Sequence, residues 1–589
     1  MNIIKTQNTD PEIRIIQEDA AFDTQLDLIS DQQDVLIYKL SIKASQPSEP
    51  KPITLKWKLP SINVKGVWKC GSIYDKRLQY DWELNHLHTR VSVDAPVISV
   101  FGHDENNVIT FACSDAINLI EMNVLLREED NHLYCHLTFF QERHPEIESY
   151  EAQIRIDIRN AILYSQSLQD VSKWWESFAS LKPSPVPPLA RMPLYSTWYQ
   201  FHQSLDEDII LEECKIAASI GYKLIILDDG WQTMDTNRGY DYTGDWEPDR
   251  FPDMSGFVQK IHALRMKFGL WFSVPFCGKH SKAYQRFKGK FLTENHRWAP
   301  VFDPRYPEVR EYLIDIYTNA LKNYKLDAFK LDFIDDFKVY PETELTKADG
   351  RDYANVNAAV DRLMTDVMRA LRAIKPDIAI EFRQQYVGPA MRKFGNMFRA
   401  FDCPNDAVSN RIRTADVKLL CGNTAVHSDP QTWHRDETVE IAAFQVLNGF
   451  FGVPQMSVYL RNAPKAQLDM IKFYTKYWNE NAAILLDGAF KAINPLANYP
   501  VLQTEKGGHL IVGVYDNVIV EINGQEKIDL LNAKVSDHIV IRNKGKADNY
   551  KMTTWNCQGV KTHDGVVMIP KGLIEFEVPV SGMIRLERA

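Results

Sequence analysis

The sequence predicts an α/β plus all-β fold, with a central TIM (β/α)8 barrel flanked by N-terminal and C-terminal antiparallel β-sandwiches. Residues 1–182 and 483–589 alternate apolar and polar side chains with a period of two, which is typical of half-buried antiparallel strands. Residues 191–482 instead alternate short apolar runs with amphipathic helical segments, which indicates repeated strand–helix units. The proline-rich stretch 183–193 cannot be a helix or a central strand, and we predict a linker there.

Eight strand–helix units fill the central region. In chain order, their strands are expected at 194–199, 223–230, 269–275, 328–333, 377–384, 397–402, 423–429 and 450–458. The first helix, within 204–222, is predicted to start with a capping box of Ser204 and Glu207 and to end at Gly221. Eight units in about 290 residues fit a closed barrel. A doubly wound open sheet is the alternative, because alternation alone does not prove closure.

Composition and charge exclude several classes of function. The net charge is −10 over 589 residues, with acids and bases interspersed, which argues against nucleic-acid or anionic-membrane partners. No run of about 18 apolar residues is present, so no membrane-spanning helix is expected. The eight scattered cysteines form no CxxC pair, so we expect reduced thiols, no metal site and no cofactor. The N-terminus lacks a signal-like apolar stretch, which favours a cytoplasmic protein, with a trimmed signal as the alternative. A homo-oligomer stays open.

Polar and indole side chains stand at the carboxyl ends of six predicted strands. They are Asp228, Asp229 and Trp231 (second strand), Trp271 (third), Lys330 and Asp332 (fourth), Glu381 and Arg383 (fifth), Arg399, Asp402 and Asp406 (sixth), and Asp429 (seventh). Barrel enzymes build their active sites at this end of the strands. The sequence therefore predicts an active site on that rim.

The fourth strand, within LDAFKLDFIDDF (326–337), carries a candidate nucleophile. Residues two apart share one face of a strand, so Lys330 and Asp332 should both face the barrel interior. We predict that Lys330 pairs with Asp332 and keeps it ionised, as a carboxylate nucleophile requires. A purely structural ion pair is the alternative. Asp335 and Asp336 lie beyond the strand and are expected to be solvated loop acids.

Other acids suggest a general acid and a site for hydroxyl groups. Asp402 ends the sixth strand and is the best candidate for a general acid. Asp406 is the other candidate. For either residue, the alternative role is that of an N-cap of the next helix. The adjacent Asp228 and Asp229 are possible metal ligands, but neither a histidine nor a third acid is close in sequence. Hydrogen bonds to sugar hydroxyls, with Trp231 covering the apolar face of the ring, fit them better.

Seven stretches are distinctive when taken together. They are STWYQF (196–201), AASIGYKLIILDDGWQ (217–232), GDWEPDRFP (244–252), MKFGLWFSVP (266–275), DPRYPEVREYL (303–313), AFKLDF (328–333) and RAFD (399–402). These stretches, and the sandwich–barrel–sandwich order, resemble glycoside hydrolase family 36, the melibiase-type α-galactosidases, and more distantly family 27. The resemblance implies a retaining double displacement on terminal α-galactosides of an oligosaccharide or glycoconjugate, without a cofactor.

The resemblance also implies residue roles. Asp332 would be the nucleophile and Asp402 the acid/base, while Asp228 and Asp229 would bind the sugar 4- and 6-hydroxyls. The further residues expected to line the sugar site are Trp231, Lys330 and Arg399, with Trp198 and Trp271 as walls, and Arg383, Asp406 and Asp429 as additional candidates.

The sequence departs from the family pattern in ways that leave the substrate open. EFRQQYVGPAMRKFG (381–395) lacks the glycine run found after the fifth strand, and Arg383, Gln384 and Gln385 are candidates to replace it at the sugar 2-position. RAFD is closer to the form of the raffinose-synthase-like branch. An α-N-acetylgalactosaminidase or an α-galactosyl transferase is therefore the alternative, ahead of a non-catalytic glycan-binding protein and a metal-dependent hydrolase.

Overall fold

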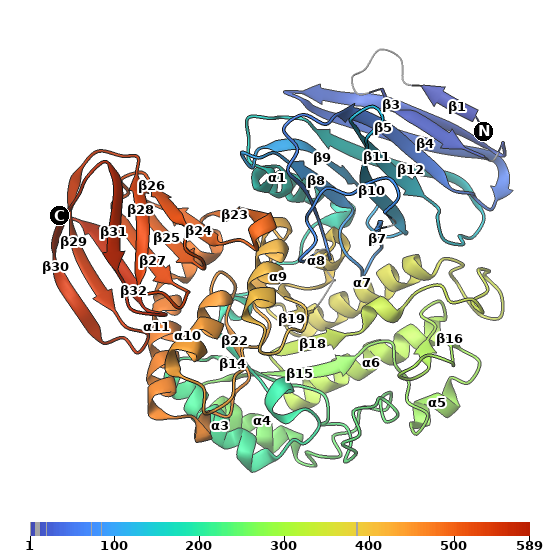
Figure 1. The fold of residues 1–589 in the computed structure, drawn as a ribbon. Coiled ribbons are helices and arrows are strands. Elements are labelled where there is room, and N and C mark those ends of the chain that lie inside the picture. Colours follow the sequence, from blue (N-terminus) through green and yellow to red (C-terminus); the bar gives the residue numbers. More distant parts are fainter. Residues whose placement is uncertain (1, 6–11, 19, 72, 84, 384–386) are drawn as a thin grey trace.

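The predicted sandwich–barrel–sandwich architecture is confirmed in the computed structural model (Figure 1). The model describes residues 2–5, 12–18, 20–71, 73–83, 85–383 and 387–589. Gln384 and Gln385, expected near the sugar 2-position, lie outside the described residues. The apolar core of the N-terminal sheets continues into the barrel, whereas the C-terminal sheets enclose a core of their own.

The N-terminal part consists of two six-stranded antiparallel sheets. One has the order β1 (Asn2–Lys5), β2 (Arg14–Gln17), β5 (Ile53–Pro60), β11 (His132–Phe139), β10 (Ile120–Arg127) and β7 (Leu87–Thr89). The other has the order β3 (Phe22–Gln32), β4 (Val35–Ser48), β12 (Ile147–Asp157), β9 (Asn107–Cys113), β8 (Val97–Phe101) and β6 (Gly66–Lys69). In the first half of β4 every second residue is buried, as the period of two predicts.

A helix that the sequence analysis did not predict follows these sheets. Helix α1 (Tyr164–Glu176) buries Leu168, Val171 and Trp175, whose spacing of three and four residues is helical. It contacts β8 and β9 on one side and the barrel helix α9 on the other. The proline-rich stretch beyond it contains the 3-10 turn η2 (Pro188–Arg191), preceded by η1 (Ala179–Leu181), so the linker is locally ordered.

Eight parallel strands form the central sheet. They are β13 (Leu194–Ser196), β14 (Leu224–Leu227), β15 (Lys267–Ser273), β18 (Ala328–Asp332), β19 (Ala379–Phe382), β20 (Met397–Arg399), β21 (Ala425–His427) and β22 (Gln455–Met456). Neighbours in chain order pair in parallel, and β22 pairs with β13. A parallel bridge between His427 and Val453 joins the remaining edges. The sheet is therefore a nearly closed barrel, and the open-sheet alternative is wrong.

Helices connect the barrel strands, and the longer ones cover the outside of the barrel (Figure 1). They are α2 (Trp198–Phe201), α3 (Glu207–Ile220), α4 (Met254–Ala263), α5 (Lys282–Arg286), α6 (Pro307–Tyr324), α7 (Val356–Ile374), α8 (Pro389–Phe394), α9 (Ala407–Leu420), α10 (Val439–Asn448) and α11 (Lys465–Asp487). The short hairpin β16 (Phe291–Thr293) and β17 (Val301–Phe302) precedes α6. Helix α3 ends at Gly221 as predicted, with φ of 107°. The predicted capping box is wrong, because Asp206 rather than Ser204 caps the helix by accepting from the Ile209 N–H.

The C-terminal part contains a seven-stranded and a three-stranded sheet. The first has the order β23 (Ala489–Ile493), β24 (Val501–Lys506), β25 (His509–Val514), β27 (Lys527–Asn532), β32 (Met583–Arg588), β29 (Asp548–Trp555) and β30 (Lys561–Ile569). The second has the order β26 (Ile519–Ile522), β28 (His538–Asn543) and β31 (Gly572–Glu577). The pairs β25–β27 and β26–β28 are parallel, so the expectation of a wholly antiparallel sandwich is wrong in these two places.

All eight cysteines are buried and free. Among the helices of the described residues, none has both the length and the apolar character that a membrane span needs.

Asp529 connects the C-terminal sheet to the barrel. Its buried carboxylate accepts two hydrogen bonds from Arg585, at 2.7 and 2.9 Å, and one from Tyr477 on α11 at 2.6 Å. His509 lies 3.0 Å from the same group. Burial alone would raise the pKa of Asp529, but the hydrogen bonds from Arg585 and His509 outweigh burial and bring it down to about 2.

Replacing this carboxylate should destabilise the C-terminal part. We expect Asp529→Asn to lower the free energy of unfolding by about 3 kcal/mol at neutral pH, because Arg585 is left without its buried partner. The pKa of about 2 in the folded chain lies below the value of about 4 for an unfolded Asp. The stabilisation is therefore complete above about pH 4 and is lost as the pH falls toward 2.

Urea unfolding of wild type and Asp529→Asn at pH 6 and pH 3 measures this effect, and the difference between them should shrink at the lower pH. Asp537→Asn is the control, since that side chain is 70% exposed. Equal unfolding midpoints for Asp529→Asn and wild type at pH 6 would contradict the prediction.

Candidate active site

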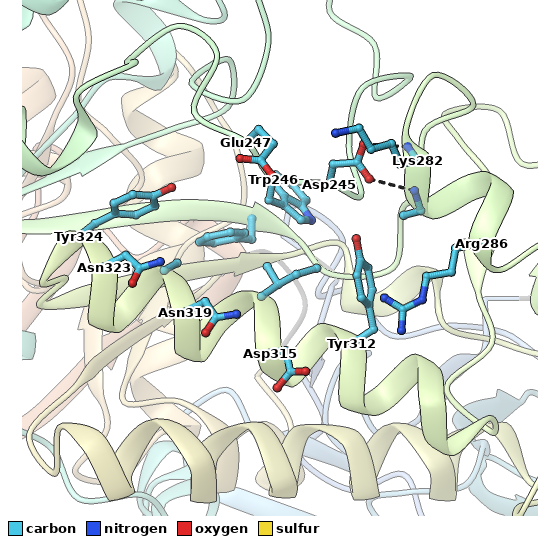
Figure 2. Close-up of a pocket in the computed structure, with 14 residues that line it drawn as sticks. Asp245, Trp246, Glu247, Lys282, Arg286, Tyr312, Asp315, Asn319, Asn323 and Tyr324 are labelled. Atoms are coloured by element: carbon cyan, nitrogen blue, oxygen red, sulfur yellow. Dashed lines mark hydrogen bonds between the residues drawn. The ribbon is translucent and has the colours of Figure 1, made fainter.

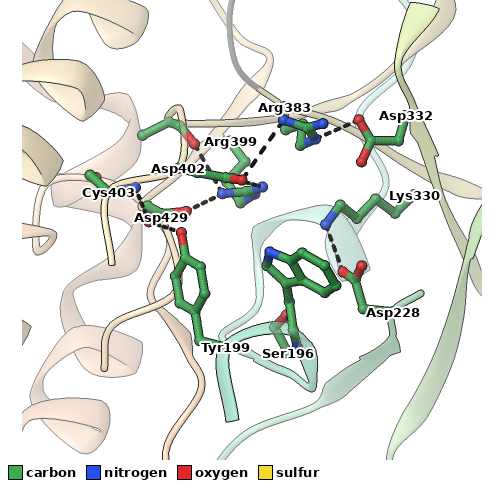
Figure 3. Close-up of polar contacts among 12 residues, drawn as sticks. Ser196, Tyr199, Asp228, Lys330, Asp332, Arg383, Arg399, Asp402, Cys403 and Asp429 are labelled. Atoms are coloured by element: carbon green, nitrogen blue, oxygen red, sulfur yellow. Dashed lines mark hydrogen bonds and ion pairs between the residues drawn. The ribbon is translucent and has the colours of Figure 1, made fainter. Parts of the chain in front are cut away.

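The residues predicted at the strand ends meet on one rim of the barrel. Figure 3 shows Lys330 and Asp332 from β18 facing Arg383, which follows β19, and Asp402, which follows β20. The side chains of Lys330, Asp332 and Arg383 are buried, whereas that of Asp402 is 31% exposed. The barrel thus brings two carboxylates of separate strands together, and one of them reaches solvent.

Three N–H donors hold Asp332. One carboxylate oxygen accepts from the Trp271 indole at 2.9 Å. The other accepts from the Phe333 backbone N–H at 2.7 Å and from Nε of Arg383. Phe333 has φ of 63°, a left-handed conformation that is uncommon for a bulky residue and marks the turn directly after the strand. The carboxylate of Asp332 is therefore fixed in orientation by its neighbours on β15 and β19.

Lys330 pairs with Asp228 and not with Asp332, so the predicted pair is wrong. The Lys330 ammonium lies 2.6 Å from Asp228, which follows β14, and both side chains are buried. Lys330 and Asp332 share the interior face as predicted, but Arg383 takes the position next to Asp332. The period of two fixes the face of a side chain; the strands on either side determine its partner.

Asp229 is held by two amides that the sequence analysis did not identify. Gln203 and Gln232 each donate to it at 2.7 Å. Burial raises the pKa of Asp229 to about 7. Gln232 lies one residue beyond the DDGW motif, so the sequence could have indicated it. Gln203 lies in a separate segment of the chain and carries no sequence signal.

Asp402 carries the exposed carboxylate of the rim. Nη2 of Arg399 donates to it at 2.7 Å, and Nη1 of Arg383 lies 3.9 Å from its other oxygen. Burial would raise the pKa of Asp402, but the charges of Arg399, Arg383 and Lys330 outweigh burial and hold it well below its usual value. In the free protein Asp402 is therefore ionised at neutral pH.

Asp406, the rival of Asp402, is the N-cap of α9. Its carboxylate accepts from the Ser409 N–H at 2.9 Å and from the Ser409 hydroxyl at 2.6 Å. This is the N-cap alternative that the sequence left open, and the side chain is exposed at the protein surface. Of the two acids, Asp402 alone contacts the arginines of the rim.

Asp429 is a buried acceptor beneath the rim. It accepts from the Tyr199 hydroxyl at 2.7 Å, from the Cys403 N–H at 2.8 Å and from Arg399. Burial raises the pKa of Asp429 to about 7 against the opposing charge of Arg399. Its oxygens thus accept hydrogen bonds within the protein, and the expectation that Asp429 binds substrate stays a prediction. Tyr199, inside the STWYQF stretch, was missed.

Arg399 is fixed by further buried contacts. Its Nε lies 3.6 Å from Glu381, whose other oxygen accepts from Gln455 at 2.6 Å. Arg399 therefore lies against three carboxylates, those of Glu381, Asp402 and Asp429.

Of the three predicted indoles, Trp231 and Trp271 are fully buried and Trp198 is partly exposed. Trp231 is fully buried, donates to the Trp271 carbonyl at 2.9 Å and stacks on Trp246 with ring centroids 5.8 Å apart. Trp271 is equally buried and donates to Asp332, and the expected roles of both indoles at a sugar stay predictions. Trp198 is partly exposed and packs edge-on against His202.

The loop after Asp332 is packed and not freely solvated, contrary to expectation. Asp335 and Asp336 lie in the 3-10 turn η3 (Ile334–Asp336), and both are partly buried. Burial, together with the charge of Asp335, raises the pKa of Asp336 to about 6. Arg90 of the N-terminal part donates to the Asp335 carbonyl at 3.0 Å, and this contact ties the loop to the preceding sheets.

A separate cleft of about 560 Å³ lies on the outside of the barrel. Figure 2 shows Trp246 and Glu247, from the segment after β14, facing Asp315, Asn319 and Asn323 of α6. None of the predicted site residues lines this cleft. Across the described residues, no group of three or more His, Cys, Asp or Glu side chains is placed to hold a metal ion.

Comparisons with known proteins agree with this architecture. Residues 161–384 match the Melibiase family model. Probable alpha-galactosidase C of Aspergillus flavus is 30% identical over 164 residues, which cover 24% of this chain and 21% of that protein. Alpha-galactosidase 2 of Pediococcus pentosaceus is 30% identical over 148 residues, 23% of this chain and 20% of that protein. The alignments thus span about a fifth of the length of these curated relatives.

Solved structures extend the likeness to the whole fold. The GH36 alpha-galactosidase AgaA of Geobacillus stearothermophilus superposes with a TM-score of 0.67 at 14% identity, over 98% of this chain and 83% of that one. The alpha-galactosidase of Lactobacillus brevis gives 0.66 at 15% identity, over 100% and 83%. The family match over residues 161–384 and the shared fold agree with the resemblance to the melibiase-type glycoside hydrolases that the motifs indicated.

Proposed function

We propose that this protein is an exo-acting retaining α-galactosidase that hydrolyses terminal α-galactosides by double displacement. The observation that carries the proposal is the pair of carboxylates, Asp332 and Asp402, which approach one guanidinium from two strands on the rim. Retaining glycosidases need two carboxyl groups about 5–5.5 Å apart. A single guanidinium that contacts both acids supports their acting together on one substrate.

In the first step, an oxygen of Asp332 attacks the anomeric carbon while the bond from that carbon to the leaving oxygen breaks. Asp402, protonated in the reactive complex, gives its proton to the leaving oxygen. In the second step Asp402 removes a proton from water, and the water oxygen attacks the anomeric carbon and releases Asp332. The donors from Trp271 and Phe333 support the first role, since they orient the carboxylate toward a fixed position.

The substrate class rests on the relatives. Variants of the Geobacillus AgaA protein were solved in complex with stachyose and with raffinose. For this chain we propose a terminal α-galactosyl group of an oligosaccharide or glycoconjugate, held near the Asp228–Lys330 pair and beside Trp198. We propose that Asp228, whose carboxylate contacts Lys330 on the interior face of the barrel, binds a sugar hydroxyl.

An α-galactosyl transferase is the second candidate, favoured by the RAFD form of the sixth strand and by the lack of a glycine run after the fifth. The chemistry of the first step is the same, and a sugar hydroxyl replaces water in the second. Analysis of products formed with and without added sugar acceptor distinguishes the two activities.

Removing the nucleophile should abolish turnover. We expect Asp332→Ala to lower kcat on an aryl α-galactoside by about 10⁴-fold or more, because the covalent intermediate can no longer form. Added azide, which fits the vacated space, should restore part of the rate and give the β-galactosyl azide. Asp315→Ala, in the outer cleft, is the matched control and should stay within about twofold of wild type. Wild-type-like turnover by Asp332→Ala would contradict the assignment of Asp332 as the nucleophile.

Replacing the acid should affect substrates according to their leaving groups. Asp402→Ala should lower kcat/KM by about 10²–10⁴-fold for galactosides with a sugar or alkyl leaving group, which needs a proton. Galactosyl fluoride, whose leaving group needs none, should be affected far less in the glycosylation step.

Asp406→Ala is the matched variant for this test. We expect it to cost about 1 kcal/mol of stability through loss of the N-cap, with the same dependence on leaving group as wild type. If Asp406→Ala and not Asp402→Ala shows the selective loss, the acid has been assigned to the wrong residue. Steady-state kinetics on the two substrate classes, with thermal unfolding, measures both outcomes.

A further inference from the structure

Arg383 lies between the two carboxylates of the proposed reaction. Its Nε donates to Asp332, and its Nη1 is 3.9 Å from Asp402 (Figure 3). The side chain is buried, and its guanidinium lies over the Phe333 ring, 4.7 Å from the ring centroid. A planar guanidinium carries several N–H donors in a fixed fork and stays charged at every working pH, so it can contact two carboxylates at once.

The two arginines at Asp402 are anchored differently. Arg399 also lies against Asp429 and Glu381, neither of which reacts in the proposed mechanism. Arg383 forms ion pairs with both of the proposed reacting groups. A charge change on Asp332 therefore alters the balance at Arg383 and leaves the contacts of Arg399 with Asp429 and Glu381 intact.

The proposed first step moves one negative charge from one carboxylate to the other. Before it, Asp332 is an anion and Asp402 carries a proton. After it, Asp332 is a neutral ester, the proton is on the leaving oxygen, and Asp402 is the anion. The summed charge of the two carboxylates is unchanged. The charge on each carboxylate does change, and Arg383 lies between them.

We propose that Arg383 is a positioning residue shared by the two carboxylates: it pairs with Asp332 before attack and with Asp402 once Asp332 has become an ester. This role rests on the proposed function and extends it. Arg383 orients the nucleophile in the free enzyme. As the covalent bond forms, its charge stabilises the carboxylate that proton donation leaves on Asp402, so nucleophilic attack and proton transfer favour each other.

Several charged or titratable groups act on Asp402 besides Arg383. They are Arg399 on β20, Lys330 on β18, Asp429 after β21, and Tyr199 and, at the end of α2, His202. Removing the positive charge of Arg383 leaves all of these in place. The pKa of Asp402 should then rise, because one of the charges that hold it down is gone.

The test compares pH profiles of kcat for Arg383→Gln and Arg383→Lys with an oligosaccharide α-galactoside, because the proposed acid is protonated in the reactive complex and not in the free enzyme. The basic limb of kcat reports loss of the proton from the acid in the enzyme–substrate complex. We expect this limb to move up by about one pH unit in Arg383→Gln and to stay in place in Arg383→Lys, which keeps the charge. Both variants should lose about tenfold or more in kcat/KM at the optimum, since the fork that orients Asp332 is lost.

Galactosyl fluoride and a second arginine provide the controls. With the fluoride, no basic limb that depends on Arg383 should appear, because no proton is needed. Arg310→Gln removes a buried arginine that pairs with Asp352 outside this rim, and it should leave the limb unmoved. An unmoved limb in Arg383→Gln, with activity lost equally at every pH, would show a merely structural role and overturn the proposal.

A second measurement does not depend on how the variants fold. In a crystal structure of the wild-type glycosyl-enzyme, trapped with a 2-fluoro galactosyl donor, Nη1 of Arg383 should lie closer to Asp402 than the present 3.9 Å. A guanidinium that stays on the esterified Asp332 overturns the shared role while leaving the nucleophile confirmed. If the wild type turns over no α-galactoside, or if Asp402→Ala keeps the basic limb, the proposed function itself or its acid fails, and the role of Arg383 falls with it.

Discussion

Charge balance at the rim of the barrel is the constraint on which the candidate site depends. Buried carboxylates are costly unless each meets a cation or enough N–H donors. Here Lys330 is matched to Asp228, Arg383 to Asp332, and Arg399 to Asp402 and Asp429. Asp229 has no cation and is instead held by two glutamine amides, with its pKa raised to about 7 by burial. Of the two acids of the proposed reaction, Asp402 is the one left partly exposed.

The N-terminal part supports this rim from outside. Arg90 and Ser92 donate to the backbone carbonyls of Asp335 and Ile334, directly after the turn that follows Asp332. Since Phe333 in that turn supplies an N–H to Asp332, the position of the turn affects the orientation of the carboxylate. The first sandwich is thus part of what holds the proposed nucleophile in place, and the continuous apolar core between the two parts is consistent with such a role.

Much of the fold followed from the sequence because it depends on patterns that local physics dictates. Alternation of period two and buried apolar runs place the strands, and the carboxyl ends of parallel strands must meet on one rim. Contacts between side chains that are far apart in the sequence could not be predicted from it. The pairing of Lys330 with Asp228 depends on reach across β15, and the burial of Trp231 depends on its stack with Trp246. Neither is encoded in the spacing of residues along one strand.

Local competition between similar residues explains another difference between the predicted and the observed structure. Ser204 and Asp206 both suit an N-cap, and a residue spacing that fits a capping box does not decide between them. The acidic side chain two residues later makes the bond to the Ile209 N–H. In the C-terminal sheets, strand alternation fixed which residues face inward, but the direction of pairing depends on how the connections cross. The parallel β25–β27 pair therefore left no signal in the pattern of either strand.

The segment after the fifth strand departs from the pattern of the resembled family and brings a charged residue to the rim. Closure of the barrel constrains the strands, and the loops beyond them vary with little effect on the fold, as the TM-score of 0.67 at 14% identity illustrates. A glycine run can offer only backbone groups to the site, whereas Arg383 brings a fixed positive charge into contact with Asp332. A charge in that position acts on both carboxylates at once. The choice of one residue at the end of β19 therefore changes the electrostatics of the whole pair, while the barrel that carries it stays the same.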